Sequence, residues 1–244
     1  MPVRRDNPLP ALIALCLSLT VNVAVAEVTD CVILLHGMAR TTSSMDDMQA
    51  FLSDEGYLVV NDGYPSREHR IEELAPMAID PAIEKCGVLN DGRHVHFVTH
   101  SLGGILVRYY FKDKSMDGLG RVVMLAPPNQ GTAASDAMRG LPGFDFINGP
   151  AGSQLGKGAS SIPLQLGKPN FEFAVIAGDR TIDPITSAVL PNPDDGKVSV
   201  DDTKLEGMSD FALVSVSHAF IMQDEDVFEL VKSFLAHGNF AELP

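Results

Sequence analysis

The chain has 244 residues, of which 45% are hydrophobic and 20% charged, a composition typical of one globular domain with a sizeable core. Its 18 lysines and arginines against 32 aspartates and glutamates give a formal net charge of −14, which excludes nucleic acid as an expected partner. The same charge opposes binding to an anionic membrane surface, although an exposed apolar mouth could still make transient contact with a lipid interface.

The N-terminal segment 1–26 has the pattern of a secretory signal peptide. Arginines precede a long apolar stretch, which closes in the A-x-A cleavage motif at 24–26. An uncleaved membrane anchor is the alternative, because the stretch approaches the ~20 residues that a spanning helix needs. We expect cleavage and export, to the periplasm or outside the cell, with 27–244 as the mature domain.

The mature sequence alternates apolar runs with amphipathic stretches. Short apolar runs predict six strands, at 31–37, 57–62, 94–100, 121–128, 171–179 and 211–217. Helical spacing predicts helices at 43–56, 71–87, 102–113 and 224–238. Pro76 and Pro81 are expected to break or kink the second helix. This alternation predicts an α/β fold with a doubly wound, mostly parallel sheet, whose reactive residues gather beyond the carboxyl ends of the strands.

Two long segments interrupt the alternation. Segment 129–170 is predicted to be a short cap-like or lid-like insertion over the active site, and 180–210 to be an acidic loop, because long loops in a compact domain are usually functional or disordered. The apolar residues expected to line an acyl pocket under the cap are Phe144, Phe146 and Ile147, with Leu141 nearby.

Removal of the signal peptide would leave two cysteines. Cys31 begins the first strand, and Cys86 ends a helix that returns to the strand at 94–100, so both are expected at the amino-terminal edge of the sheet. A single pair in an exported protein predicts a disulfide, with two buried free thiols as the alternative.

A serine stands at the corner between the third strand and the helix after it. The stretch Thr99-His100-Ser101-Leu102-Gly103 fits the pattern G-x-S-x-G, with threonine in place of the first glycine. A turn that merely needs small residues is the alternative. With a strand before it and a helix after it, Ser101 is predicted to be a nucleophile raised at the edge of the sheet.

A serine nucleophile needs a base, and two histidines follow Ser101 in the chain. His237 lies near the end of the last helix, where a solvated side chain is expected. His218 directly follows the last strand, and its neutral imidazole can accept a proton near neutral pH. His218 is therefore the predicted base, while His100 is expected to pack at the turn.

The third catalytic residue should be an acid between the serine and His218, which holds the imidazole in the right tautomer. Spacing alone leaves four candidates open: Asp179, Asp183, Asp194 and Asp195.

The oxyanion of an acyl-transfer intermediate needs two N–H donors. The amide of Leu102 follows the nucleophile, and the amide of Met38 follows Gly37 at the end of the first strand. These two amides are the predicted oxyanion hole, with His36 as scaffolding of the same loop.

Taken together, these motifs resemble the α/β-hydrolase superfamily, in particular its branch of small bacterial secreted lipases and esterases. The motifs that match in order are LLHGM, THSLGG, LAPPNQG, NPDDGKVSV and SHAFIM. The resemblance implies that the triad acid lies in a D-G-x-V stretch, which here begins with Asp195. It also implies a core of eight strands, of which two N-terminal antiparallel ones would be missing here.

We therefore expect a serine hydrolase that cleaves small-molecule or lipid esters with an apolar acyl group and needs no cofactor. A thioesterase, an amidase or an acyltransferase would use the same residues, and a non-catalytic binding protein of the same fold is a further alternative. A calcium site at Asp194, Asp195, Asp201 and Asp202 is the alternative to a solvated acidic loop, which is the simpler expectation, so no metal is predicted. Neither the acyl chain length nor the oligomeric state follows from the sequence.

Overall fold

The computed structural model describes residues 1, 29–87, 92–140 and 142–242, apart from the side chains of Phe144 and Asp145. Residues 2–26 of the predicted signal peptide, Leu141 and the side chain of Phe144 therefore lie outside the described residues. Within the described ranges, no helix is both long and apolar enough to cross a membrane.

The described residues form one parallel sheet of six strands, in the order β2-β1-β3-β4-β5-β6. The strands are β1 Cys31–Leu35, β2 Leu58–Asn61, β3 Val95–His100, β4 Leu119–Leu125, β5 Phe173–Arg180 and β6 Asp210–Ser217. This sheet confirms the predicted doubly wound architecture. In the part of the chain that is described, no antiparallel strand precedes β1.

The strand order reverses between β1 and β3. The chain moves outward from β1 to β2 and then returns to place β3 on the other side of β1. A crevice opens beyond the carboxyl ends of the strands at such a point. The loop after β1 and the turn after β3 meet there, and these segments contain Met38 and Ser101.

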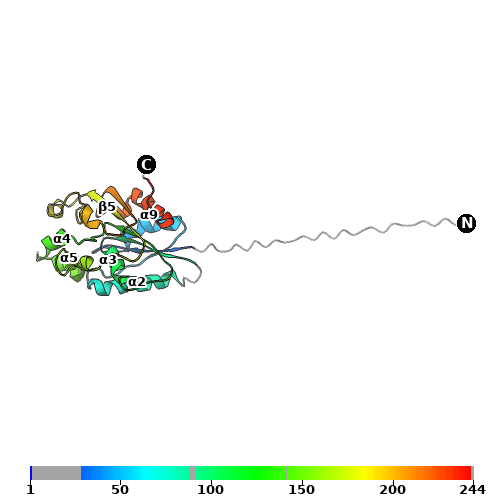
Figure 1. Cartoon of the computed structure of the whole chain (residues 1–244), viewed down its shortest axis with the longest axis horizontal. Coiled ribbons are helices and arrows are strands. Elements are labelled where there is room, and N and C mark those ends of the chain that lie inside the picture. Colours follow the sequence, from blue (N-terminus) through cyan, green and yellow to red (C-terminus); the bar gives the residue numbers. More distant parts are fainter. Residues whose placement is uncertain (2–28, 88–91, 141, 243–244) are drawn as a thin grey trace.

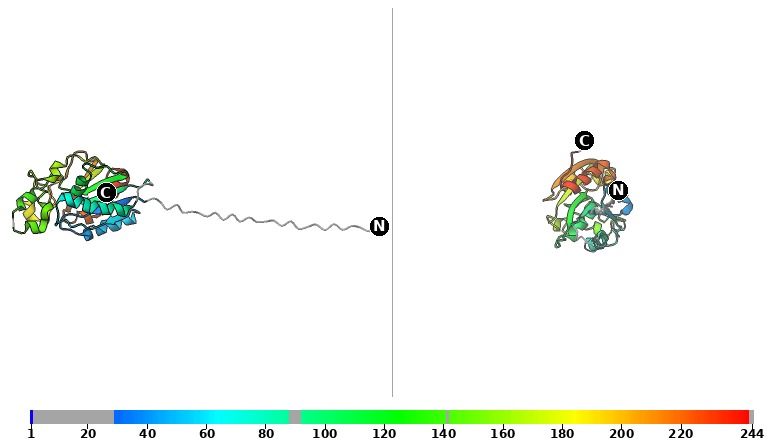
Figure 2. Two further views of the ribbon diagram at one scale, coloured as in Figure 1. Left: turned by 90° about the horizontal axis from the view of Figure 1, so that it is seen from below. Right: turned by 90° about the vertical axis from the view of Figure 1, so that its right-hand side faces the viewer.

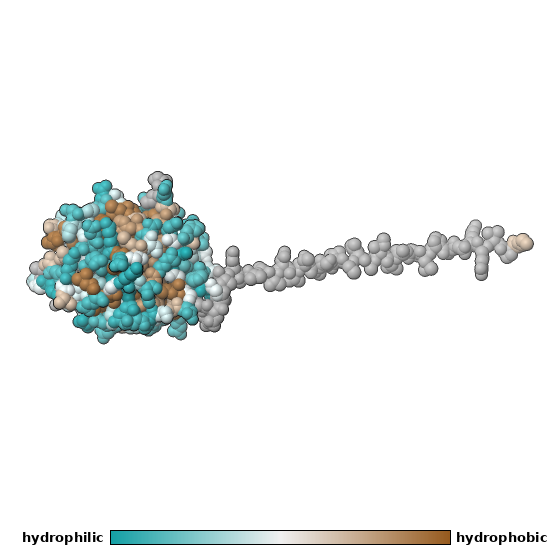
Figure 3. Space-filling model, viewed as in Figure 1, coloured by the Kyte–Doolittle hydropathy of each residue, from teal (hydrophilic) through white to brown (hydrophobic). Residues whose placement is uncertain are grey.

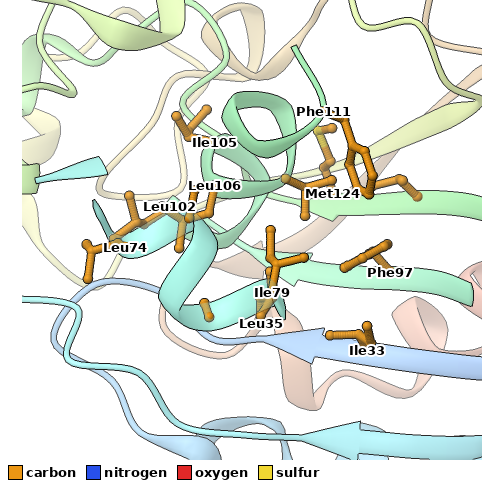
Figure 4. Packing of buried hydrophobic residues seen from close by; sticks show 14 of the residues in the cluster. Ile33, Leu35, Leu74, Ile79, Phe97, Leu102, Ile105, Leu106, Phe111 and Met124 are labelled. Atoms are coloured by element: carbon orange, nitrogen blue, oxygen red, sulfur yellow. The ribbon is translucent and has the colours of Figure 1, made fainter. Parts of the chain in front are cut away.

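Four helices cover the two faces of the sheet, α2 and α3 on one and α1 and α9 on the other (Figure 1). Their bounds are α1 Asp46–Asp54, α2 Ile71–Cys86, α3 Leu102–Tyr110 and α9 Glu225–His237. Alternate residues of β1 enter the two cores, since Ile33 packs towards α2 and α3, and Leu34 towards α1 and α9. Figure 4 shows Ile33, Phe97 and Ile105 in the first of these cores.

The expected break at Pro76 and Pro81 is absent, because α2 runs through both positions. Proline has no N–H, so Pro76 leaves the carbonyl of Glu72 without its helix hydrogen bond, and Pro81 leaves that of Met77 without one. Both of those residues reach solvent, where water can satisfy the carbonyls, and the opposite side of α2 is fixed by burial against the sheet.

The two long segments contain short helices, which the sequence patterns did not predict. Segment 129–170 contains α4 Ala133–Met138, α5 Phe144–Gly152 and α6 Ile162–Gln165, and 180–210 contains α7 Pro184–Ser187 and α8 Val200–Thr203. Two 3-10 helices, η1 Thr42–Met45 and η2 Ile221–Gln223, complete the described elements. Figure 2 shows α4 and α5, in green, at one end of the molecule.

Cys31 and Cys86 form the predicted disulfide, with their Cα atoms 5.7 Å apart. The bond joins the first residue of β1 to the last residue of α2. It therefore lies at the amino-terminal edge of the sheet, opposite the edge at which Ser101 stands.

Candidate active site

Ser101 occupies a strained turn between β3 and α3. Its backbone has φ 52° and ψ −116°, a region that residues with a Cβ rarely adopt. Its N–H donates to the Leu125 carbonyl at 2.8 Å, which fixes the turn to β4. A Cβ on Gly103 would lie 2.6 Å from the Leu35 carbonyl oxygen, so the turn can approach β1 only with glycine there. The Ser101 hydroxyl is thereby held at the carboxyl edge of the sheet.

His218 lies between Ser101 and a carboxylate. It follows β6 directly, and its Nε2 is 3.1 Å from the Ser101 Oγ, a distance at which the hydroxyl donates to the neutral ring. Its Nδ1 lies 2.7 Å from Oδ2 of Asp195 and donates to it in the matching tautomer. The three side chains thus form one hydrogen-bonded series across 117 residues of sequence.

Asp195 is 1% exposed, and backbone amides hold its side chain in place. Its Oδ1 accepts from the amides of Lys197 at 2.9 Å and Val198 at 2.8 Å, which leaves Oδ2 for the imidazole. Its own carbonyl accepts from the His218 amide at 3.0 Å, so the two residues are joined by backbone as well. Gly196, with φ 96°, makes the turn that brings these amides back onto the carboxylate.

In the described structure none of the other three acids that spacing left open is hydrogen bonded to His218. Asp179 lies 3.9 Å from the Arg180 Nε. Asp183 accepts from Lys197, and this bond holds the pKa of the Asp183 carboxyl below its ordinary value. Asp194 accepts from the Ser187 hydroxyl and the Gly196 amide.

The expectation of a solvated acidic loop is wrong for three of its four aspartates. Asp194, Asp195 and Asp202 are 3%, 1% and 7% exposed, and each is hydrogen bonded within the protein. Asp201 is exposed and pairs with Lys204 at 2.9 Å. Among the residues with described side chains, no group of three or more histidines, cysteines or acids has the geometry of a metal site.

The two predicted oxyanion donors are the amides of Met38 and Leu102. In the described part of the chain, neither N–H has a protein acceptor, so both are available to a ligand. Leu102 is the first residue of α3, where backbone N–H groups have no partner within the helix. Both amides belong to segments that meet at the strand-order reversal.

The loop that contains Met38 is held by the segment after β2. The Tyr64 hydroxyl donates to the His36 carbonyl at 2.6 Å, and the Ala39 amide donates to the Ser66 Oγ at 3.1 Å. Sequence reasoning missed Tyr64 and Ser66, because they contribute contacts between segments rather than a local motif.

Three further histidines, His36, His100 and His237, lie where they are expected from the sequence. His36 is buried and stacked on Tyr64, with ring centroids 4.2 Å apart, and burial lowers the pKa of its imidazole. His237 is exposed at the end of α9. His100 is buried, with its ring centroid 4.7 Å from that of His218.

A cavity of about 400 Å³ opens over Ser101 and His218. Its apolar lining includes four residues of segment 129–170, Ala134, Met138, Ile147 and Leu155. Of the residues expected to line an acyl pocket, Ile147 lines this cavity, whereas Phe146 is 82% exposed and is not part of the lining. Other exposed apolar side chains belong to Ile182, Ile185 and Phe220. Figure 3 shows hydrophobic side chains among the hydrophilic ones, some of them at the end of the molecule that contains α4 and α5.

A second cavity, of about 600 Å³, lies at the amino-terminal edge of the sheet, far from Ser101. It is lined by Asp30, His94 and His96 among others, and both histidines lie within 3.6 Å of the Asp30 carboxylate. No serine–histidine pair of the kind formed by Ser101 and His218 occurs among its described residues.

No protein-family model and no curated protein matches this sequence. Solved structures do match it. The mature lipase BlEst2 of Bacillus licheniformis aligns with a TM-score of 0.69 and 16% identity over 85% of this chain and 92% of its own. A metagenomic carboxyl esterase aligns with a TM-score of 0.62 and 16% identity, over 86% and 71% of the two chains. Phospholipase PlaB of Legionella pneumophila aligns with a TM-score of 0.62 and 22% identity over 78% of this chain, but over only 53% of its own length.

These neighbours are lipases and esterases with identities below 25%, so the likeness concerns the fold. Together with the parallel sheet and its strand order, it shows that the chain has the α/β-hydrolase fold.

Proposed function

We propose that this protein is a serine hydrolase that cleaves carboxylic esters with an apolar acyl group through an acyl-enzyme intermediate. The observation that carries the proposal is the hydrogen-bonded series from Asp195 through His218 to Ser101, at 2.7 Å and 3.1 Å. An acid, a base and a nucleophile in this order form the arrangement that activates serine for acyl transfer.

The proposed reaction starts with attack of the Ser101 Oγ on the ester carbonyl carbon, while His218 takes the hydroxyl proton. The amides of Met38 and Leu102 donate to the oxyanion of the tetrahedral intermediate. When this intermediate collapses, the carbon–oxygen bond to the alcohol breaks and His218 returns the proton to the leaving alcohol. A water molecule, deprotonated by His218, then attacks the acyl-enzyme and releases the acid.

The apolar wall of the cavity supports an apolar acyl group, since a ligand buried there gains about 25 cal/mol for each Å² of apolar surface removed from water. The lipase and esterase neighbours support an ester as the substrate class. The reaction we propose requires no metal or organic cofactor.

The test measures hydrolysis of 4-nitrophenyl butyrate and labelling by a fluorophosphonate. Ser101→Ala should abolish labelling and lower kcat by about 10⁴- to 10⁶-fold, because the triad acts as a unit. His218→Ala should be similarly inactive, whereas His237→Ala, which changes an exposed histidine, should retain full activity. A folded Ser101→Ala variant within tenfold of the wild type would refute the proposed nucleophile.

A thioesterase, an amidase or an acyltransferase would employ the same three residues. Parallel assays with a butyryl thioester, a butyryl anilide and an added alcohol acceptor rank these activities against ester hydrolysis. A non-catalytic binding protein would show neither turnover nor fluorophosphonate labelling.

We also propose that the protein is exported. The Cys31–Cys86 disulfide supports this, because such bonds persist in oxidising compartments. Fractionation of the native host, with N-terminal sequencing of the protein, should find the chain outside the cytoplasm and beginning at Glu27. A cytoplasmic protein that begins at residue 1 would contradict the proposal.

A further inference from the structure

Two basic side chains line the cavity over Ser101, and they differ in their partners. The Nζ of Lys197 lies 2.8 Å from Oδ2 of Asp183, so its charge is neutralised. Arg40 is half-buried, and one of its terminal nitrogens donates to the Ala219 carbonyl at 3.2 Å. Among the described side chains, no carboxylate lies within ion-pair distance of Arg40. The cavity of this acidic protein therefore contains an arginine whose charge has no partner.

The other carboxylate that lines the cavity does not compensate Arg40. Asp195 is already bound by the His218 ring and by the amides of Lys197 and Val198. The guanidinium has donors beyond the one used by Ala219, and a planar guanidinium can bind a carboxylate or a phosphate with two parallel hydrogen bonds. An anion that enters the cavity would meet these donors.

The contact with Ala219 indicates which part of a substrate Arg40 would meet. Ala219 directly follows His218, whose Nε2 faces the Ser101 hydroxyl. In the proposed reaction His218 protonates the leaving alcohol, so the alcohol part of the ester must lie beside His218. In that reaction Arg40, which contacts the residue next to His218, would face the alcohol part.

We propose that Arg40 binds an anionic group, a phosphate or a carboxylate, on the alcohol part of the ester substrate. This inference rests on the proposed ester hydrolysis and narrows its substrate class to esters of anionic alcohols. Arg40 is then a residue that determines specificity, and the ion pair of Lys197 and Asp183 is its control, because both residues line the same cavity and together carry no net charge.

The experiment compares two esters that differ in the charge of the leaving group, 3-butyryloxybenzoate and its neutral amide, 3-butyryloxybenzamide. The wild type should prefer the charged ester in kcat/KM. Arg40→Gln should lower this preference about tenfold, as expected for loss of a charge-assisted hydrogen bond in a partly open site. Arg40→Lys should restore part of it. The double variant Asp183→Asn, Lys197→Met removes the ion pair without changing the net charge of the cavity, and it should leave the ratio within about twofold of the wild type.

Two further pairs identify the source and position of the anion. A comparison of kcat/KM for butyryl glycerol 3-phosphate and monobutyrin tests a phosphate on the alcohol part. A comparison of 4-nitrophenyl hemisuccinate with its methyl ester tests a charge on the acyl part, and no preference is expected there. Raising the salt concentration should weaken the preference for an anionic alcohol.

A structural role of Arg40, through the Ala219 carbonyl, would lower turnover of charged and neutral esters alike and leave their ratio unchanged. That result would overturn the proposal, as would a wild type without preference for either anionic alcohol.

Binding of glycerol 3-phosphate or 3-hydroxybenzoate to Ser101→Ala, measured by calorimetry, is a readout independent of turnover. It should be lost in the Ser101→Ala, Arg40→Gln double variant. If the wild type hydrolyses no ester but Ser101→Ala still binds these anions through Arg40, the proposed function is refuted and the anion site is not.

Discussion

The hydroxyl of Tyr64 donates a 2.6 Å hydrogen bond to the carbonyl of His36, and the two rings stack 4.2 Å apart. Tyr64 is buried, and burial raises the pKa of its phenol, so the hydroxyl remains a donor at physiological pH. Through this contact the segment after β2 fixes the loop that presents the Met38 amide. The position of that amide thus depends on a residue outside the proposed catalytic set.

Tyr64→Phe should lower kcat for ester hydrolysis about tenfold with little change in KM. Loss of an oxyanion donor costs about 10²–10³-fold, and a loosened donor should cost less. Affinity for a trifluoromethyl ketone, which mimics the tetrahedral intermediate, should fall in parallel. Tyr110→Phe, which removes a hydrogen bond to Asp80 on α2, is the control and should keep wild-type kcat. An equal loss of kcat in Tyr64→Phe and Tyr110→Phe would mean that Tyr64 affects only the stability of the fold.

Asp195→Asn should lower kcat by up to about 10⁴-fold, because an amide cannot hold His218 in the tautomer that accepts the serine proton. Asp179→Asn should retain most activity, since Asp179 has no hydrogen bond to His218 in the described structure. Steady-state kinetics on the two purified variants, with circular dichroism to verify folding, make the comparison. The reverse ranking would transfer the acid role to Asp179.

The double variant Cys31→Ser, Cys86→Ser should unfold at lower urea concentration than the oxidised wild type. The disulfide closes a loop between residues 55 positions apart, which in the chain-entropy model contributes about 4 kcal/mol. Activity of the folded variant should persist, because the bond lies at the edge of the sheet opposite Ser101. Two alkylatable thiols in the unreduced, denatured wild type would contradict the disulfide itself.

Stability should fall in mild acid because of His100. Burial, followed by the charges of His218 and Arg40, holds the pKa of the His100 imidazole well below its ordinary value of 6.5. Below about pH 6.5 the unfolded chain therefore binds a proton at His100 that the folded chain does not bind. The contribution of a neutral His100 to the free energy of unfolding is complete above that pH and declines below it. The slope for one such group is about 1.4 kcal/mol per pH unit.

Urea unfolding at pH 7.5, 6.5, 5.5 and 5.0 measures this dependence. His100→Asn should reduce the decline in the free energy of unfolding below pH 6.5. His237→Asn, at an exposed position, should leave this decline unchanged. An equally steep decline in His100→Asn would assign the effect to other groups, among them His36, whose pKa burial also lowers.

The sequence by itself determined the architecture, because the alternation of strands and helices is a local property of apolar spacing. It also placed Ser101 and His218 at one edge of the sheet, since the carboxyl ends of parallel strands meet there. It predicted the helix at 71–87, but the expected break at Pro76 and Pro81 does not occur, although propensity disfavours a helix there. Burial of one side of α2 and the access of water to the other outweigh that preference.

The tertiary structure decided which aspartate meets His218 and what surrounds the site. Four aspartates fit the spacing, but only the turn at Gly196 brings the amides of Lys197 and Val198 onto Asp195 and leaves one oxygen for the imidazole. Tyr64 and Arg40 donate hydrogen bonds to residues 28 and 179 positions away in the chain. Contacts of this kind have no local pattern, because they arise only when the sheet brings the ends of distant strands together.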